Sequence, residues 1–143
     1  MPYCDVSDVV KNLSEEKAKK LSNDIDASKV DETVINECII NGASLIDGYL
    51  RGRYTVPVDE QSGECILKNL NIDLAVTELH ERRGKLAPDL IKERKTKSLE
   101  RLLLIQKGVI LIAVNEKPVN HRVTIAISSP KQVFTDTFYS EMP

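Results

Sequence analysis

The segment of residues 46–57, Ile-Asp-Gly-Tyr-Leu-Arg-Gly-Arg-Tyr-Thr-Val-Pro, constrains the fold of this chain more than any other. Its first residues complete the apolar face of a long predicted helix. Gly52 is expected directly after that helix, where a positive φ favours glycine. Pro57 disfavours helical backbone at the residue before it, so the chain should leave the segment extended. The segment therefore predicts an abrupt change from helix to extended chain.

Apolar residues elsewhere recur at helical spacing, and the pattern predicts a mainly α fold with about five helices in a compact bundle. Asp5, Ser14 and Asp31 are the residue types that cap helix N-termini, and each precedes such a pattern. The fourth helix is apolar on too many sides for a single stripe, so it should be central. Lys107 and Gly108 should end the fifth. The helices are expected near residues 5–13, 14–22, 31–51, 66–83 and 88–107.

Two glycines, Gly42 and Gly48, lie inside the predicted long helix. Each costs about 1 kcal/mol relative to alanine in a helix interior. A glycine there either allows a close neighbour or is a tolerated weak position, and the sequence leaves both interpretations open.

After Gly108 the period of the apolar residues changes. Val109–Val114 is a β-like run, residues 123–127 alternate, and residues 115–118 between them are turn formers. The pattern predicts a small C-terminal β-hairpin. We therefore expect a single domain over residues 1–130 and an extended tail over residues 131–143. The tail contains three aromatic residues, Phe134, Phe138 and Tyr139, and we expect it to be mobile in the free subunit and to order on assembly. Alternatively, it packs back on its own domain.

Charge is distributed unevenly along the chain, although the formal net charge is only −2. Residues 1–60 carry 12 acidic and 7 basic side chains, whereas residues 61–143 carry 10 acidic and 13 basic ones. This asymmetry allows like subunits to pack with the acidic half of one against the basic half of the next. Ordinary solvated helix faces would give the same asymmetry.

The most basic stretch is residues 80–97, with seven Lys or Arg residues and three acidic ones. A surface of this kind can bind phosphates, with an affinity that falls as salt rises. No aromatic residue is interleaved, so a platform for stacking single-stranded bases is not indicated. Three interpretations of this stretch remain open. It is a solvated helical surface, a positive surface facing DNA or an acidic neighbour, or the binding surface of a small cytosolic nucleic-acid-binding module that uses residues 82–97.

No motif in the sequence predicts catalysis, a cofactor or a metal site. Cys4, Cys38 and Cys65 form no CxxC pair, and His80 and His121 are far apart in the chain. A zinc site is therefore not expected, and the thiols should be reduced. Cys38 falls on an apolar helix face, as a small core residue would. We expect a protein that is not an enzyme, although a helical enzyme whose site only the fold brings together remains a further hypothesis.

The N-terminus has no basic region followed by an apolar run, and the apolar run Val109–Val114 is too short to span a bilayer. We therefore expect a cytoplasmic protein with no membrane partner, unless it is built into a larger assembly.

The block Ile-Asp-x-Tyr-Leu-x-Gly-Arg-Tyr-x-x-Pro, within residues 46–57, has a fairly specific resemblance to the head–tail connector (neck adaptor) family of Mu-like phages. The order of elements over residues 3–138 resembles that family more loosely. The resemblance implies a helical adaptor fold, no catalysis, and a ring of about a dozen subunits that joins the portal and head to the tail. It implies the virion neck as the location, with the host bacterial cytoplasm as the site of assembly.

The resemblance also implies partners: other copies of the chain, the portal protein, a tail-side neck protein, and possible non-specific DNA contact in the lumen. Tyr49 and Leu50 should be core residues. The candidate contact residues belong to the block, the basic stretch and the tail, namely Asp47, Arg51, Arg53, Tyr54, Arg82, Arg83, Phe134, Phe138 and Tyr139.

Overall fold

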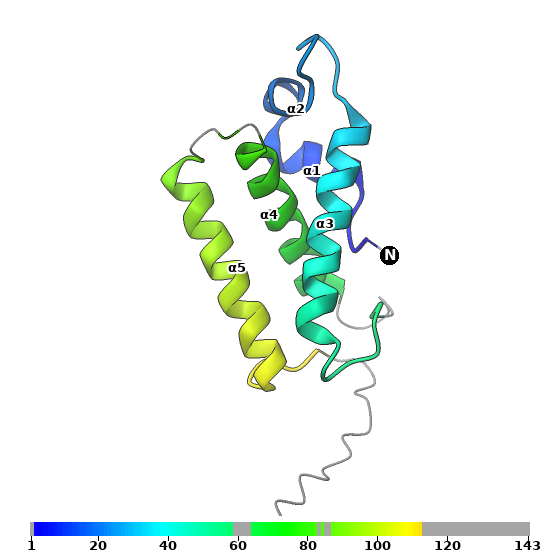
Figure 1. Cartoon of the computed structure of the whole chain (residues 1–143), viewed down its shortest axis with the longest axis vertical. Coiled ribbons are helices and arrows are strands. Elements are labelled where there is room, and N and C mark those ends of the chain that lie inside the picture. The colour runs from blue at the N-terminus through cyan, green and yellow to red at the C-terminus, as the bar shows by residue number, and fades with distance from the viewer. Residues whose placement is uncertain (1, 59–63, 83, 85–86, 113–143) are drawn as a thin grey trace, which may run out of the picture.

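The computed structural model describes residues 2–58, 64–82, 84 and 87–112, and this part of the chain folds into five helices packed together. The mainly α prediction is confirmed for these residues. The predicted helix positions are correct to within about two residues (Figure 1). The helices are α1 (Val6–Leu13), α2 (Glu15–Ser22), α3 (Glu32–Leu50), α4 (Glu64–Glu81) and α5 (Asp89–Lys107).

Three of the helices, α1, α2 and α3, directly follow the predicted capping residues Asp5, Ser14 and Asp31. Asp31 precedes α3, and its carboxylate accepts hydrogen bonds from the backbone N–H groups of Thr33 and Val34 at 3.1 and 3.3 Å. At α1 the carboxylate of Asp8 accepts from the backbone N–H of Asp5 at 3.1 Å, and this bond lowers the pKa of Asp8. Acceptors at these positions satisfy N–H groups that have no partner within the helix.

Ser14 is the single residue between α1 and α2. Its backbone has φ 76° and ψ 149°, and its side chain makes no capping hydrogen bond. A residue with a Cβ is strained in this region, by about 1–3 kcal/mol.

Replacing Ser14 with glycine should therefore raise the free energy of unfolding by about 1 kcal/mol, because the relief of strain exceeds the added freedom of the unfolded chain. Urea denaturation followed by circular dichroism measures the change. The control variant Ser14→Ala keeps the Cβ, so its free energy of unfolding should not rise. A glycine variant less stable than the alanine variant would contradict the strain.

Helix α4 lies at the centre of the bundle, as its apolar composition predicts, and it contacts each of the other four helices (Figure 1). The buried side chains form two clusters along it. One joins α1 and α2 to the first half of α3, around Val9, Ile35 and Val76. The other joins the second half of α3 to α5, around Leu50 and Leu102. Cys38 is buried in the first cluster, which confirms its prediction as a core residue.

The two glycines of α3 have different roles. A Cβ on Gly42 would lie 2.7 Å from Asn71 Oδ1 and 3.3 Å from Leu74 Cβ, so this glycine allows α3 and α4 to approach closely. A Cβ on Gly48 would meet nothing within 4 Å. Asn71 is fully buried, and neither polar atom of its amide has a hydrogen-bond partner among the described residues. The contact between α3 and α4 is therefore close but carries an uncompensated polar group.

Helix α5 ends as predicted, at a glycine with a positive φ of 78°. Gly108 donates its N–H to the carbonyl of Ile105 at 3.0 Å, and Val109 donates to Leu104 at 2.9 Å. This pair of bonds is the Schellman arrangement. The glycine also leaves room for the guanidinium of Arg53, which a Cβ at this position would overlap.

The prediction for the end of α3 is wrong in one respect, because Gly52 does not have a positive φ. The chain instead continues in right-handed turns, and the N–H groups of Arg53 and Tyr54 both donate to the carbonyl of Leu50, at 2.9 and 2.8 Å. These bonds satisfy the helix end and direct Tyr54 into the core.

The predicted hairpin and tail lie almost entirely outside the described residues. Residues 109–112 are described and have no strand assignment.

Candidate assembly interface

The segment of residues 46–58 is held to the N-terminus of the chain by one tyrosine. The hydroxyl of Tyr3 donates to Asp47 Oδ1 on α3. The same hydroxyl accepts the backbone N–H of Val58 at 3.2 Å. Tyr3 is itself buried, with 5% of its surface exposed. Asp47 therefore has a structural role within the folded chain.

Tyr54 and Arg53 tie the same segment to the end of α5. Tyr54 is fully buried, and its hydroxyl accepts the backbone N–H of Ile112 at 3.3 Å. The Arg53 guanidinium lies against Gly108, where the helix C-terminus favours positive charge. Tyr54 and Arg53, both predicted as partner contacts, therefore make contacts within the chain. Arg51, directly after α3, is exposed.

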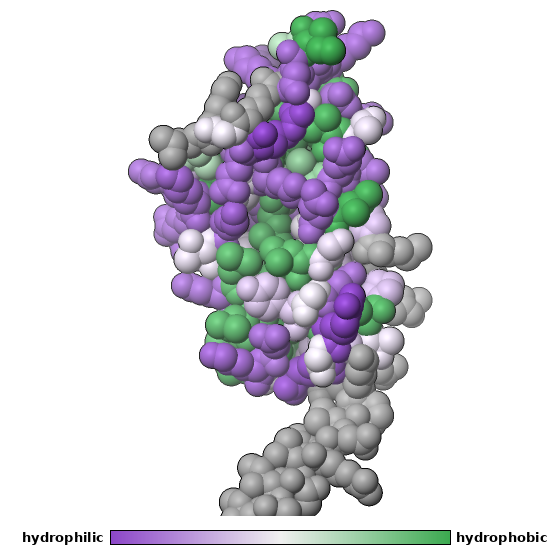
Figure 2. Space-filling model, viewed as in Figure 1, coloured by the Kyte–Doolittle hydropathy of each residue, from purple (hydrophilic) through white to green (hydrophobic). Residues whose placement is uncertain are grey.

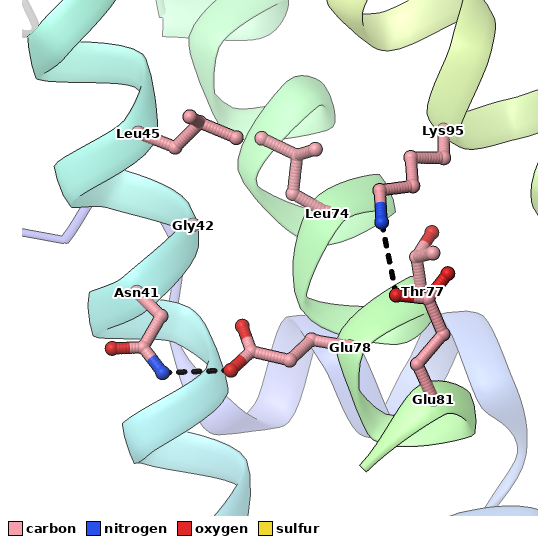
Figure 3. Close-up of a pocket in the computed structure, with 8 residues that line it drawn as sticks. All are labelled: Asn41, Gly42, Leu45, Leu74, Thr77, Glu78, Glu81 and Lys95. Carbon is pink, nitrogen blue, oxygen red and sulfur yellow. Dashed lines mark hydrogen bonds and ion pairs between the residues drawn. The ribbon is translucent and has the colours of Figure 1, made fainter. Parts of the chain in front are cut away.

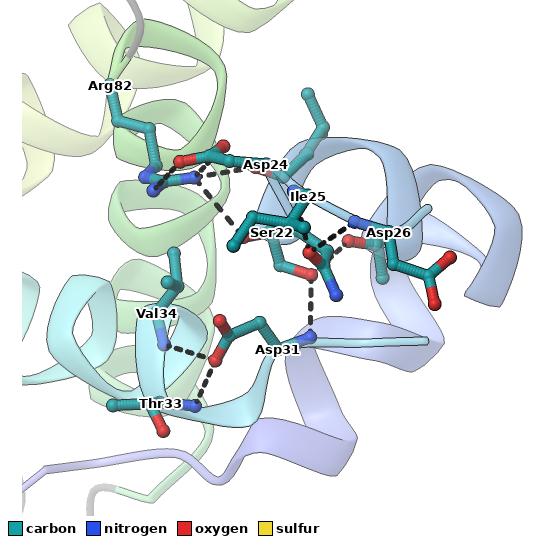
Figure 4. Close-up of polar contacts among 11 residues, drawn as sticks. Ser22, Asp24, Ile25, Asp26, Asp31, Thr33, Val34 and Arg82 are labelled. Carbon is teal, nitrogen blue, oxygen red and sulfur yellow. Dashed lines mark hydrogen bonds and ion pairs between the residues drawn. The ribbon is translucent and has the colours of Figure 1, made fainter. Parts of the chain in front are cut away.

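Arg82, directly after α4, forms hydrogen bonds to the end of α2 and the loop that follows it (Figure 4). Its guanidinium donates to the backbone carbonyls of Leu21 and Ser22 at 3.1 and 3.3 Å, and to both carboxylate oxygens of Asp24. Ser22 Oγ in turn accepts the N–H of Asp31 at 3.0 Å. Arg82, predicted as a partner contact, therefore makes its contacts within the chain.

Much of the positive charge of residues 80–97 is also paired within the chain. Lys95 lies 2.9 Å from Glu81, and Lys97 lies 2.8 Å from Glu93. Arg94 donates to Asn12 at 3.1 Å, and its guanidinium lies 3.8 Å from Asp73. These pairs reduce the charge that the stretch offers to phosphates. Arg83 and the tail residues Phe134, Phe138 and Tyr139 lie outside the described residues.

The buried thiols are poorly suited to nucleophilic or metal chemistry. Burial raises the pKa of Cys4 to about 12, with Asp8 and Asp5 adding to the effect. Burial also raises the pKa of Cys38 to about 11. In the described part of the chain, no three His, Cys, Asp or Glu residues are grouped as metal ligands would be. His80 Nδ1 is 2.8 Å from the carbonyl of Val76 on its own helix.

These pKa values predict slow alkylation. In a Cys65→Ser variant at pH 8, Cys4 and Cys38 should react with iodoacetamide at least about 100-fold more slowly in the folded protein than in urea, because the thiolate is the nucleophile. Mass spectrometry of timed samples measures the rates. Rapid labelling of either residue without denaturant would contradict the burial.

A hollow of about 210 Å³ lies between α3, α4 and α5. Figure 2 shows apolar surface exposed in this region of a face that is otherwise mainly hydrophilic. Leu45 and Leu74 face each other across the hollow (Figure 3). Asn41 donates to Glu78 at 2.7 Å along one side of it. The lining of the hollow combines apolar side chains with polar ones, as surfaces that contact other proteins do.

Sequence reasoning missed a second apolar surface, which we call the α5 end. It consists of four exposed side chains on the last turn of α5 and the segment after it: Leu103, Leu104, Val109 and Leu111, between 37% and 69% exposed. A signal was present, because the four consecutive apolar residues 102–105 point to all sides of a helix and cannot all face one core. Exposed apolar groups gathered at one place are typical of a protein–protein interface.

A protein-family model described as Bacteriophage Mu, Gp36 matches residues 3–126 of the chain. The matched region includes the segment of residues 46–58 and all five described helices. No curated protein matches the chain. Among the described residues, no helix is both long and apolar enough to cross a membrane.

Proposed function

Because the chain belongs to the Bacteriophage Mu Gp36 family, we propose that this phage protein is a structural subunit of the neck of a tailed phage or prophage. In this role it forms an oligomeric ring that joins the portal and head to the tail. Its partners are other copies of itself, the portal protein and a tail-side neck protein. The protein acts by binding and has no catalytic role.

The observation that carries this proposal is the α5 end. Leu103, Leu104, Val109 and Leu111 are exposed beside a compact bundle whose other large apolar residues are mostly buried. Covering such a surface contributes about 25 cal/mol for each Å² removed from water. A subunit that works inside an assembly gains this energy when it meets its partner, whereas a protein that acts alone has no use for the exposed surface.

The proposal also gives the tail, residues 131–143, a role in joining the protein to phage heads. Deleting residues 131–143 should leave a cooperative urea transition, because the described core lies entirely within residues 3–112. The same deletion should abolish attachment to phage heads, measured by complementation of a phage that lacks the gene. Loss of the cooperative transition would assign the tail a folding role instead.

The ring itself is tested by size-exclusion chromatography with light scattering over a range of concentrations, followed by negative-stain imaging. We expect a species of ring mass to grow with concentration. A monomer at every concentration would restrict the proposal to assembly on a portal template. Salt-sensitive retention of the monomer on DNA would instead favour the nucleic-acid-binding alternative, against which the ion pairs of Lys95 and Lys97 argue.

A further inference from the structure

The loop between α2 and α3 presents an isoleucine to solvent on a well-ordered frame. Ile25 is 98% exposed. Its N–H and that of Asp26 both donate to Asn23 Oδ1 at 3.0 Å, and Asn23 Nδ2 donates to the carbonyl of Lys29 at 3.2 Å. Ser28 donates twice to the Asp26 carboxylate, at 3.0 and 2.7 Å. An apolar side chain on a pre-organised loop loses little conformational freedom when it binds.

A hollow of about 270 Å³ lies between α1, α4 and the start of α5, with apolar side chains in its depth and polar ones, including Asn12 and His80, elsewhere in its lining. Leu13 and Val76 line its depth, since they are 7% and 0% exposed. Leu90 is 68% exposed and forms part of its rim, with Ile91 beside it. The hollow is large enough for one aliphatic side chain, and its apolar depth is of matching chemistry.

The loop and the hollow carry opposite charges. Asp26 follows Ile25 directly, and in the described part of the chain it has no ion pair. Lys17 and Arg94 line the hollow, and Lys17 likewise has no ion pair among the described residues. Complementary charges of this kind align two surfaces as they meet.

We propose that Ile25 of one copy of this chain inserts into the hollow beside Leu90 of the next copy. The α2–α3 loop and the start of α5 lie at the same end of the bundle, on different sides of it (Figure 1). A contact between two different surfaces of like subunits is heterologous, and it closes into a ring when the rotation per subunit allows. The proposal rests on the ring function above and supplies one contact for it.

Three matched variants test this contact, each placing aspartate at an exposed site: Ile25→Asp, Leu90→Asp and the control Ile40→Asp, at residues that are 98%, 68% and 46% exposed. Asp at residue 90 falls in the first turn of α5, where acidic residues are tolerated. Under conditions in which the wild type forms rings, alone or on portal, the first two variants should need at least about tenfold more protein to assemble. The control should assemble as the wild type does.

Disulfide cross-linking tests directly whether residue 25 of one copy lies beside residue 90 of another. In a Cys65→Ser background, Ile25→Cys in one chain and Leu90→Cys in another should give a covalent dimer under diamide when mixed. A chain with both substitutions should give a ladder of oligomers. Either single variant oxidised alone should give less dimer than the mixture. No preference for the mixed dimer would overturn the contact.

The two proposals fail separately. If Ile25→Asp forms rings at the wild-type concentration, this contact is wrong and the ring function stands. If the wild type forms no ring even on portal, the ring function fails, and the cross-link still decides whether the contact exists.

Discussion

Replacing Tyr54 with alanine is expected to lower the free energy of unfolding by about 3–5 kcal/mol, the usual cost of removing a buried aromatic side chain. Tyr54 is fully buried in the cluster that joins α3 to α5. It also anchors the chain after α5 through Ile112. Urea denaturation followed by far-ultraviolet circular dichroism measures the loss.

The variant Tyr54→Phe separates packing from hydrogen bonding. It keeps the ring but leaves the buried N–H of Ile112 without its acceptor, so we expect a loss of about 1–2 kcal/mol. If alanine at this position cost less than about 1 kcal/mol, Tyr54 would not be a core residue. Any assembly defect in these variants then has to be corrected for the loss of folded protein.

Replacing Gly42 with valine should lower the free energy of unfolding by about 2–3 kcal/mol, because the new side chain overfills the contact between α3 and α4. The Cβ alone would lie 2.7 Å from Asn71 Oδ1, and Leu74 blocks the other direction. The thermal midpoint and the urea midpoint both measure this loss. The matched control is Gly48→Val, at a position of the same helix where a Cβ meets nothing within 4 Å.

A double-mutant cycle with Asn71→Ala identifies the cause of the Gly42 effect. Removing the Asn71 amide vacates the space that the valine needs, so at least half of the loss at Gly42 should disappear in that background. Equal losses in the two backgrounds would show that Asn71 is not the obstacle. Equal losses at Gly42 and Gly48 would show that helix propensity, rather than packing, governs both positions.

The helices could be predicted from the sequence because their ends are local. Asp31 binds N–H groups two and three residues away, and Gly108 binds carbonyls three and four residues away. The central position of α4 also follows from its own composition. Gly52 was predicted wrongly because the deciding interaction is not local to it. The chain turns there so that Tyr54 can reach the core and Ile112.

The candidate site was less predictable, because the same residue types serve contacts within and between subunits. Arg82 looks like a surface cation in sequence, yet it binds carbonyls of residues about 60 positions earlier. Arg53 likewise lies against Gly108. The exposed Ile25 has no sequence signal, since one apolar residue in a polar loop is unremarkable until the loop's hydrogen bonds and exposure are known.

The most direct measurement of the central claim is negative-stain imaging of purified portal rings with and without this protein, together with the mass of the complex. The neck function predicts an added ring on one face of the portal, with several copies of the chain per portal. The separate proposal of the Ile25 contact predicts that Ile25→Asp lowers the number of bound copies while Ile40→Asp does not. Portal rings unchanged in mass and appearance at saturating protein would contradict the account.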